Sequence, residues 1–174
     1  RQMCIRDRFS IDFVIHEPAG PASHWAVNCE EGDRIVAMRY GEQPFALPEP
    51  PPAGYLLLGD LAGYPAIRAL VAAIPEDSPV VVYLERHSPD DDHIALPEGP
   101  NITASWVDEL PEGQALVQAI SDGDWAGWYA WVTAETASTR HAKTLLQKKF
   151  GLNRATLHAH AYWAVSYTHL RAHE

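Results

Sequence analysis

The sequence predicts an α/β fold with a parallel, doubly wound nucleotide-binding sheet. Beyond residue 53, short apolar segments of strand length alternate with segments of helical period. This order is typical of parallel strands that are buried between two layers of helices. A proline-dense stretch, residues 44–52, precedes the pattern and cannot form a helix or a central strand, because proline lacks the amide donor and fixes φ. It therefore marks a domain boundary.

Three elements are expected before the prolines. Residues 11–16 alternate apolar with polar side chains and predict a strand, and residues 35–40 predict a second one. Between them, residues 21–29 predict a short helix that opens at Gly20 and Pro21.

Eight elements are expected after the prolines. The predicted strands are residues 55–58, 80–85, 102–107, 128–132 and 156–163. The predicted helices are residues 64–74, 113–120 and 137–150.

The pattern divides the chain into five segments. They are residues 9–46, a proline-rich linker at 47–53, the α/β domain at 54–164, and two tails at 1–8 and 165–174. The tails match no period expected beside their neighbours and resemble translated adapter sequence, so they are left out of the functional argument. On this interpretation the natural protein is longer on both sides.

Composition excludes several classes of function. The formal net charge is −10 and only 13 residues are Lys or Arg, which argues against nucleic-acid binding. No apolar run approaches the roughly 20 residues that span a bilayer, so no membrane segment is expected. Two cysteines, Cys4 and Cys29, form neither a disulfide framework nor a metal finger, and a cytoplasmic location fits best.

The turn after the first α/β strand is the strongest candidate for ligand binding. The apolar strand ends at Gly59 and Asp60, and Pro65 lies near the first turn of the next helix. Such a turn brings backbone N–H groups and the positive end of a helix to the carboxyl edge of the sheet, where a pyrophosphate can bind. An ordinary strand-to-helix turn is the alternative, since no GxGxxG fingerprint is present.

Several short motifs, in order along the chain, resemble the siderophore-interacting protein family. They are FVIH at residues 13–16, GPASHW at 20–25, GD at 32–33, GDLAGYPA at 59–66, WVTAE at 131–135 and AYW at 161–163. The family consists of FAD-dependent ferric-siderophore reductases with a ferredoxin-reductase-like build. The resemblance implies that residues 9–46 are the end of an antiparallel FAD-binding β-barrel and that residues 54–164 bind NAD(P)H.

The resemblance also implies roles for individual residues. Those expected to contact FAD are His16, Gly20, Pro21, Ala22, Ser23 and Trp25. Those expected to contact the nicotinamide nucleotide are Gly59, Asp60, Leu61, Ala62, Pro65 and Glu135, while Tyr162 and Trp163 would lie near the two rings. No catalytic acid or base and no metal ligand is expected, because the cofactors carry the electrons.

The activity that the resemblance implies is electron transfer from NAD(P)H through FAD to a ferric siderophore, with release of Fe(II). A ferredoxin is a further candidate donor, and a monomer is expected. The family's Arg-x-Tyr-Thr/Ser flavin strand is absent from this chain, so the alternative is a non-catalytic nucleotide-binding fragment without a competent flavin site. Two strands cannot close a barrel, so we expect Phe13, Ile15, Ile35 and Val36 to be only partly covered.

Charged residues leave three questions open. Arg140, in a basic segment that ends at Arg154, is the candidate contact for an anionic siderophore, against a solvated helix face as the alternative. Acidic residues 90–92 disfavour a nucleotide 2′-phosphate, whereas Arg86 favours one, so NADH and NADPH are not separated. His158 and His160 share one strand face, but a metal site there is the less favoured interpretation.

Overall fold

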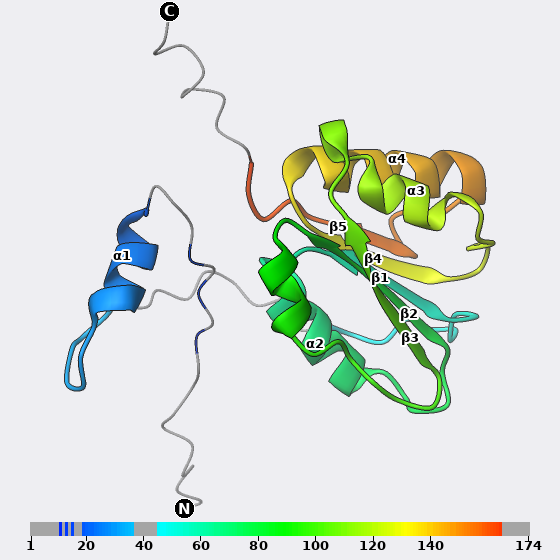
Figure 1. The fold of residues 1–174 in the computed structure, drawn as a ribbon. Coiled ribbons are helices and arrows are strands. Elements are labelled where there is room, and N and C mark those ends of the chain that lie inside the picture. The colour runs from blue at the N-terminus through cyan, green and yellow to red at the C-terminus, as the bar shows by residue number, and fades with distance from the viewer. Residues whose placement is uncertain (1–10, 12, 14, 16–18, 37–44, 165–174) are drawn as a thin grey trace, which may run out of the picture. The chain divides into compact units, whose positions relative to one another are not determined.

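The computed structural model describes residues 11, 13, 15, 19–36 and 45–164 (Figure 1). The chain divides into two compact units, Arg1–Pro44 and Phe45–Glu174. The second unit holds the predicted α/β domain.

The described part of the first unit contains one helix, α1, over Pro21–Asn28. Gly20 is its N-cap, and Pro21 follows where a missing N–H is harmless. The predicted helix is confirmed, one residue shorter at its end. Ile11, Phe13 and Ile15 lie outside any strand, and the other predicted strand positions up to residue 16 lie outside the described residues.

Apolar side chains of this unit are only partly covered, as the sequence predicts. Ile15 is 50% exposed, Ile35 48% and Val36 88%. Phe13 is half-buried and packs against Trp25, with 5.9 Å between the ring centroids. Residues 35 and 36 are not in a strand, and residues 37–40 of the second predicted strand lie outside the described part.

The second unit is built on a five-stranded parallel sheet, which confirms the predicted fold class. The strands are β1 (Tyr55–Gly59), β2 (Val80–Arg86), β3 (Ile102–Asp108), β4 (Tyr129–Thr133) and β5 (Leu157–Ala159). Their order in the sheet is β3-β2-β1-β4-β5, and every pairing is parallel.

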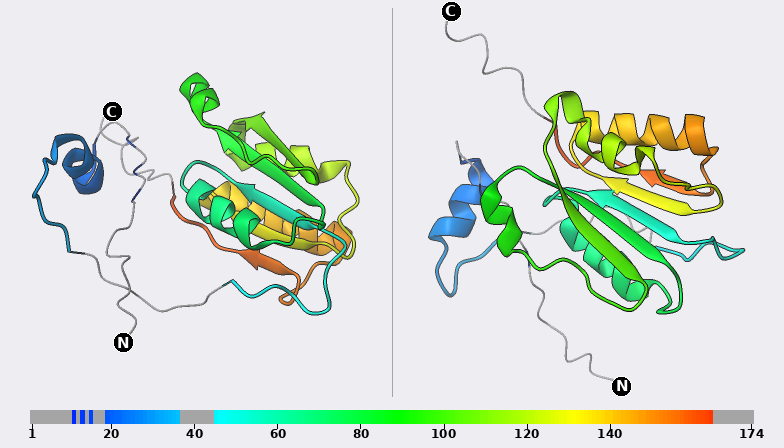
Figure 2. Two further views of the ribbon diagram at one scale, coloured as in Figure 1. Left: turned by 90° about the horizontal axis from the view of Figure 1, so that it is seen from below. Right: turned by 45° about the vertical axis from the view of Figure 1, so that its right-hand side comes forward.

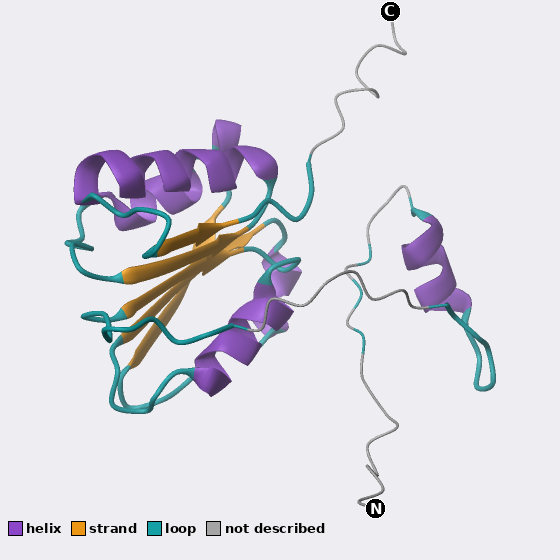
Figure 3. Ribbon diagram, turned by 180° about the vertical axis from the view of Figure 1, so that it is seen from behind, coloured by secondary structure: helices purple, strands orange, loops and turns teal. Residues whose placement is uncertain are grey.

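Helices cover both faces of this sheet (Figures 1 and 3). They are α2 (Tyr64–Ala73), α3 (Ala115–Ser121) and α4 (Thr136–Phe150), with short 3-10 turns η1 (Pro89–His93) and η2 (Pro111–Gly113). α3 and α4 lie on one face and α2 lies on the other, as the two further views in Figure 2 also show.

Strand β1 is buried on both faces because it lies in the middle of the sheet. Leu56 and Leu58 join the core beneath α3 and α4, together with Leu116 and Leu146. Tyr55 and Leu57 point the other way, into the core beneath α2. A strand buried on both faces reads as a continuous apolar run, which is why the sequence located it well.

The structure corrects several boundaries. The helix predicted at residues 113–120 begins at Ala115, because η2 ends at Gly113 with φ of +67°. The last strand is much shorter than residues 156–163; beyond it, single backbone hydrogen bonds and an isolated bridge between Trp163 and Glu135 continue the contact with the chain after β4. The acidic run at 90–92 forms η1, capped by Ser88 and by the buried Asp91, while Asp90 and Asp92 are exposed.

The connectivity creates a topological switch point. The chain passes from β1 to β2 and β3 at one side of the sheet, and then crosses over to place β4 on the other side of β1. In open parallel sheets, ligands bind at the carboxyl edge near such a point. The carboxyl ends of β1 and β4 are therefore where a site is expected.

Candidate functional site

The end of β1 is closed by the side chain of Asp60, which is 1% exposed. One carboxylate oxygen, Oδ1, accepts the backbone N–H groups of Ala62 at 2.9 Å and Gly63 at 3.1 Å. The other, Oδ2, accepts the N–H of Glu135 at 3.0 Å and the indole N–H of Trp163 at 2.8 Å. A buried carboxylate thus joins the first strand-to-helix turn to the end of β4 and to the C-terminal segment.

This arrangement changes the interpretation of the Gly-Asp turn. The N–H groups of Ala62 and Gly63, which a pyrophosphate could use, already donate to Asp60. Nucleotide contact by Gly59, Leu61 or Pro65 stays a prediction, while the architectural role of Asp60 is evident in its four hydrogen bonds.

Glycine is required in this turn because β4 lies very close. A Cβ atom at Gly59 would come within 2.7 Å of Ile67 Cδ1 and 2.8 Å of the Thr133 carbonyl oxygen. At Gly63 it would come within 2.2 Å of that same oxygen. Packing within the fold therefore demands glycine at these two positions, whether or not a ligand approaches the backbone.

The start of α4 forms the opposite side of the switch point. Glu135 is the N-cap, and its carboxylate accepts the N–H of Ala137. The carbonyl oxygen of Trp163 accepts the N–H of Thr136 at 3.0 Å and its hydroxyl at 2.9 Å. The helix start is therefore capped by its own chain, with Trp163 held at two polar atoms.

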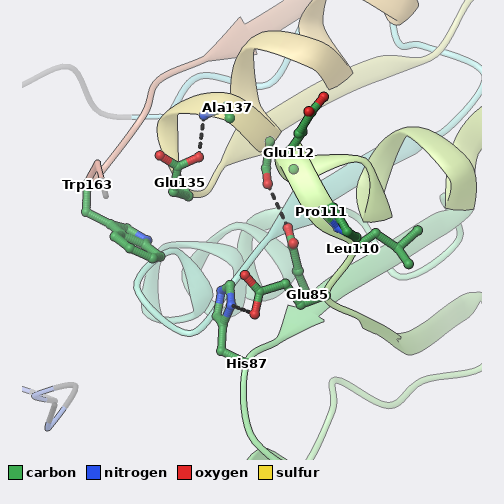
Figure 4. Close-up of a pocket in the computed structure, with 11 residues that line it drawn as sticks. Glu85, His87, Leu110, Pro111, Glu112, Glu135, Ala137 and Trp163 are labelled. Carbon is green, nitrogen blue, oxygen red and sulfur yellow. Dashed lines mark hydrogen bonds and ion pairs between the residues drawn. The ribbon is translucent and has the colours of Figure 1, made fainter. Parts of the chain in front are cut away.

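A cleft of about 400 Å³ opens beside this point, at the carboxyl ends of β2 and β3 (Figure 4). The residues that line it are Glu85, His87, Glu109, Leu110, Pro111, Glu112, Gly113, Glu135, Ala137, Ser138 and Trp163. It follows that β2, β3, η2, the start of α4 and the C-terminal segment all contribute to one cavity.

Glu85 is the buried acid of this cleft. Its side chain is 2% exposed and accepts a hydrogen bond of 2.9 Å from the hydroxyl of Ser138. Burial raises the pKa of Glu85, and the Ser138 hydrogen bond and His87 oppose that rise. A carboxyl group with a raised pKa is well suited to donate as well as accept hydrogen bonds.

His87 stands between Glu109 and Trp163. Its Nδ1 lies 3.1 Å from Oε2 of Glu109, and its ring meets that of Trp163 edge-on with centroids 5.7 Å apart. Figure 4 shows the rings of His87 and Trp163 at the same side of the cleft. Four glutamates line the cleft against one histidine, so its potential favours neutral or cationic groups over phosphates.

Arg86 follows Glu85 but does not supply a free positive charge. Its guanidinium pairs with Asp108, and its Nη1 lies 2.6 Å from Oδ1 of Asp92. These two carboxylates raise the pKa of Arg86 above its ordinary value, and Arg86 in turn lowers the pKa of Asp108. Because it is paired in this way, Arg86 favours a 2′-phosphate less than the sequence alone suggests.

The structure brings only some of the predicted site residues together. Asp60, Glu135 and Trp163 meet at the switch point, and Gly59, Leu61, Ala62 and Pro65 belong to the same turn. Tyr162 is 46% exposed and its pKa is raised by partial burial. Arg140 is exposed on α4 and does not line the cleft.

The predicted FAD contacts belong to the first unit. Gly20, Pro21, Ala22, Ser23 and Trp25 form or precede α1, and Ser23 is buried. The N-cap, Gly20, has no side chain, and a helix N-terminus attracts anions. His16 lies outside the described residues.

The sequence analysis did not find Glu85, His87, Glu109, Glu112 and Ser138 as site residues. Two positional signals were available. Glu85 and His87 close β2, and Glu109 follows β3, so the parallel topology alone places all three at the carboxyl edge.

Of the two histidines of the last segment, His158 is partly buried and His160 is exposed. The ring of His158 stacks on that of Trp131, with centroids 3.7 Å apart, and burial lowers the pKa of His158. Within the part of the chain that the structure describes, no three His, Cys, Asp or Glu side chains are grouped to hold a metal ion.

Comparison with known families decides the lineage. The profile described as "Siderophore-interacting protein" matches residues 52–166. The chain belongs to the siderophore-interacting protein family. Residues 4–41 match the "Siderophore-interacting FAD-binding domain", so both family domains are represented in the chain.

Siderophore-interacting relatives are found among curated proteins and solved structures. The chain is 46% identical over 155 residues to the mycobactin import ATP-binding/permease protein IrtA of Mycolicibacterium smegmatis, covering 89% of this chain and 18% of IrtA. It is 27% identical over 171 residues to the ferric vibriobactin reductase ViuB of Vibrio cholerae, covering 90% of this chain and 59% of ViuB.

The siderophore-interacting protein SipS of Aeromonas hydrophila has the same fold, with a TM-score of 0.72 at 24% identity; the match covers 88% of this chain and 61% of SipS. None of the helices among the described residues is long and apolar enough to cross a membrane.

Proposed function

We propose that this chain is part of an FAD-dependent reductase that passes electrons from NAD(P)H to a ferric siderophore and releases Fe(II). The observation that carries the proposal is the order of two family matches: the FAD-binding domain at residues 4–41 and the siderophore-interacting domain at 52–166. A parallel sheet with a cleft at its carboxyl edge lies within the second match.

FAD and the nicotinamide nucleotide supply the hydride and single-electron chemistry, and the chain holds and aligns them. The start of α1 suits the FAD pyrophosphate because a helix N-terminus attracts anions, and Trp25 belongs to the same helix. The cleft suits the uncharged part of the nucleotide, because its glutamates can accept hydrogen bonds from sugar hydroxyls. Trp163 offers an aromatic wall.

We propose a mycobactin-type ferric chelate as the substrate. The 46% identity to a mycobactin import protein supports this class over the vibriobactin class, at 27% identity. Arg140 remains our candidate contact for the anionic chelate, on the exposed side of α4. A ferredoxin donor, a monomeric state and a cytoplasmic location also remain predictions.

The second candidate function is a nucleotide-binding region without a competent flavin site. One observation favours it: the family's Arg-x-Tyr-Thr/Ser flavin strand does not occur among the 174 residues. In this case the 174-residue chain binds little FAD.

One experiment separates the two candidates. The chain is titrated with FAD, and flavin absorbance is measured after gel filtration; ferric mycobactin reduction is then followed as Fe(II) chelate formation with NADH, NADPH or reduced ferredoxin. The same assay is run on the chain joined downstream of the missing flavin-domain segment of ViuB. Flavin loading and turnover in the joined protein support the reductase. A joined protein that binds flavin but reduces no chelate with any donor contradicts it.

A further inference from the structure

We infer that Asp60 is a positioning residue: its buried carboxylate holds Trp163 as one wall of the carboxyl-edge cleft. This inference deepens the proposed function, because it names the residue that shapes the proposed nucleotide site. It assigns Asp60 no contact with a ligand.

Asp60 is buried although it lies at the carboxyl edge of the sheet. It follows β1 directly, at the switch point where parallel sheets bind ligands, yet it is 1% exposed. All four of its hydrogen-bond donors are N–H groups without a formal charge. Hydrogen bonds to a buried carboxylate are stronger than those between neutral groups, and their geometry is correspondingly well fixed.

Asp60 holds the segment that follows β5. Beyond β5, the chain has no regular strand up to residue 164, and the hydrogen bonds of Tyr162 to Ala134 and of Trp163 to Thr136 fix the backbone there but not the indole ring. Trp163 is 38% exposed, so packing alone does not fix its ring. The 2.8 Å bond from its indole N–H to Oδ2, 103 residues away in sequence, supplies the missing restraint.

The position of the Trp163 ring determines the shape of the cleft. Trp163 lines the cavity and meets the ring of His87 edge-on, so a rotation of the indole would reshape the wall nearest to Glu135 (Figure 4). Oδ2 of Asp60 also receives the N–H of Glu135, another lining residue. One carboxylate oxygen therefore sets two neighbouring parts of the same wall.

The test uses indole NMR on the 174-residue chain, whose six tryptophans give six side-chain N–H cross-peaks. Trp163→Phe assigns the peak of Trp163. We expect this N–H to exchange slowly with water despite its partly exposed ring. In Asp60→Asn, the indole N–H peak of Trp163 should move upfield and exchange faster with water. Whichever way the new side-chain amide is turned, this indole N–H no longer has a charged acceptor. Trp125, whose indole donates to the Ile120 carbonyl at 2.9 Å, is the internal control.

A Trp163 peak that exchanges freely in the wild type, or that ignores Asp60→Asn while Trp125 is unchanged, overturns the inference. If Asp60→Asn does not fold, Trp163→Phe carries the test. Loss of the indole donor should then shift the backbone amide of Glu135, which shares Oδ2, and an unmoved Glu135 amide overturns the inference.

The affinity for NADH distinguishes a positioning role of Asp60 from a purely structural one. With NADH as the probe, Asp60→Asn and Trp163→Phe should each raise Kd about threefold to tenfold, the scale of one lost hydrogen bond. The double variant should be no weaker than either single variant, since both changes remove the same restraint. Additive losses contradict the inference. A wild type that binds neither NADH nor NADPH but shows the protected Trp163 peak supports the positioning of Trp163 and contradicts the proposed function.

Discussion

The hydroxyl of Ser138 donates a 2.9 Å hydrogen bond to the buried carboxylate of Glu85. This bond joins the end of β2 to the first turn of α4, two elements that are 53 residues apart in sequence. Glu85 is thereby kept in the cleft wall even though burial disfavours its charged form. The pair makes the stability of the fold sensitive to pH.

Glu85→Gln should stabilise the chain more at pH 8 than at pH 4. Burial raises the folded pKa of Glu85 above its ordinary value of 4.5, so the unfolded chain releases this proton first as pH rises. The unfolded state then binds fewer protons than the folded state, and the free energy of unfolding falls with pH. Glutamine has no proton to release. Urea unfolding of both proteins at the two pH values measures the difference.

The matched control for this comparison is Glu112→Gln, which removes the same charge from an exposed position in the cleft wall. Because Glu112 is exposed, Glu112→Gln should lack the gain in stability at pH 8 that burial gives Glu85→Gln. If the unfolding free energies of the two variants respond to pH in the same way, the raised pKa of Glu85 does not contribute to the pH dependence of stability. Ser138→Ala should destabilise the chain by about 1–3 kcal/mol, because it leaves a buried acceptor without its donor.

Gly63→Ala should cost about 2 kcal/mol or more of unfolding free energy, the upper range for forcing an atom into a packed site. The new Cβ would lie 2.2 Å from a backbone oxygen, that of Thr133, which cannot move without shifting β4. Gly99→Ala is the control, because its Cβ would meet the movable end of Ile102 at 2.8 Å. Equal urea midpoints for the two variants would show that the end of β4 adapts freely.

Sequence patterns located the central strands because strands buried on both faces leave long apolar runs. β1 and β2 begin at the predicted residues 55 and 80; the edge strand β3, which has no buried residue, also begins at its predicted residue, 102. The last strand was overestimated: β5 has only three paired positions, and beyond it His160 and Tyr162 donate single backbone hydrogen bonds to Val132 and Ala134 before the Trp163 indole reaches Asp60. Such long-range hydrogen bonds have no local signature.

The site was predictable only in part for a related reason. Asp60 and Glu135 were found through motifs, but the burial of Asp60 and its four donors depend on segments up to 103 residues away. The acidic cleft was missed because Glu85, His87 and Glu109 carry no motif. Their meeting depends on β2 and β3 being neighbours in the sheet, and the order of the strands is not specified by a single sequence.

Acidification below the ordinary pKa of histidine should destabilise the packing of His158 on Trp131. Burial lowers the pKa of His158 below its ordinary value of 6.5, and the neighbouring His160 adds to the effect. As pH falls through 6.5, the unfolded chain binds a proton before the folded chain does, so stability falls. His158→Gln should remove this part of the pH dependence. An NMR titration in which the ring of His158 protonates at or above pH 6.5 contradicts the prediction.

NADH should bind more tightly than NADPH, a prediction that depends on the proposed function. The cleft at the ends of β2 and β3 carries Glu85 and Glu109, which repel a 2′-phosphate, and the nearby Arg86 is neutralised by Asp92 and Asp108. Isothermal titration with both nucleotides measures the preference.

Asp108→Asn should narrow that preference, since it removes one of the two carboxylates that hold Arg86 and lets the guanidinium attract the extra phosphate. Because exposed ion pairs are worth about 0–1 kcal/mol, the gain in NADPH affinity should be no more than about fivefold. Asp122→Asn, an equal charge change on an exposed residue that does not line the cleft, is the control. NADPH that binds more tightly than NADH to the wild type would show that the phosphate lies away from these acids. Equal gains from Asp108→Asn and Asp122→Asn would reduce the effect to net charge alone, with no part for the release of Arg86.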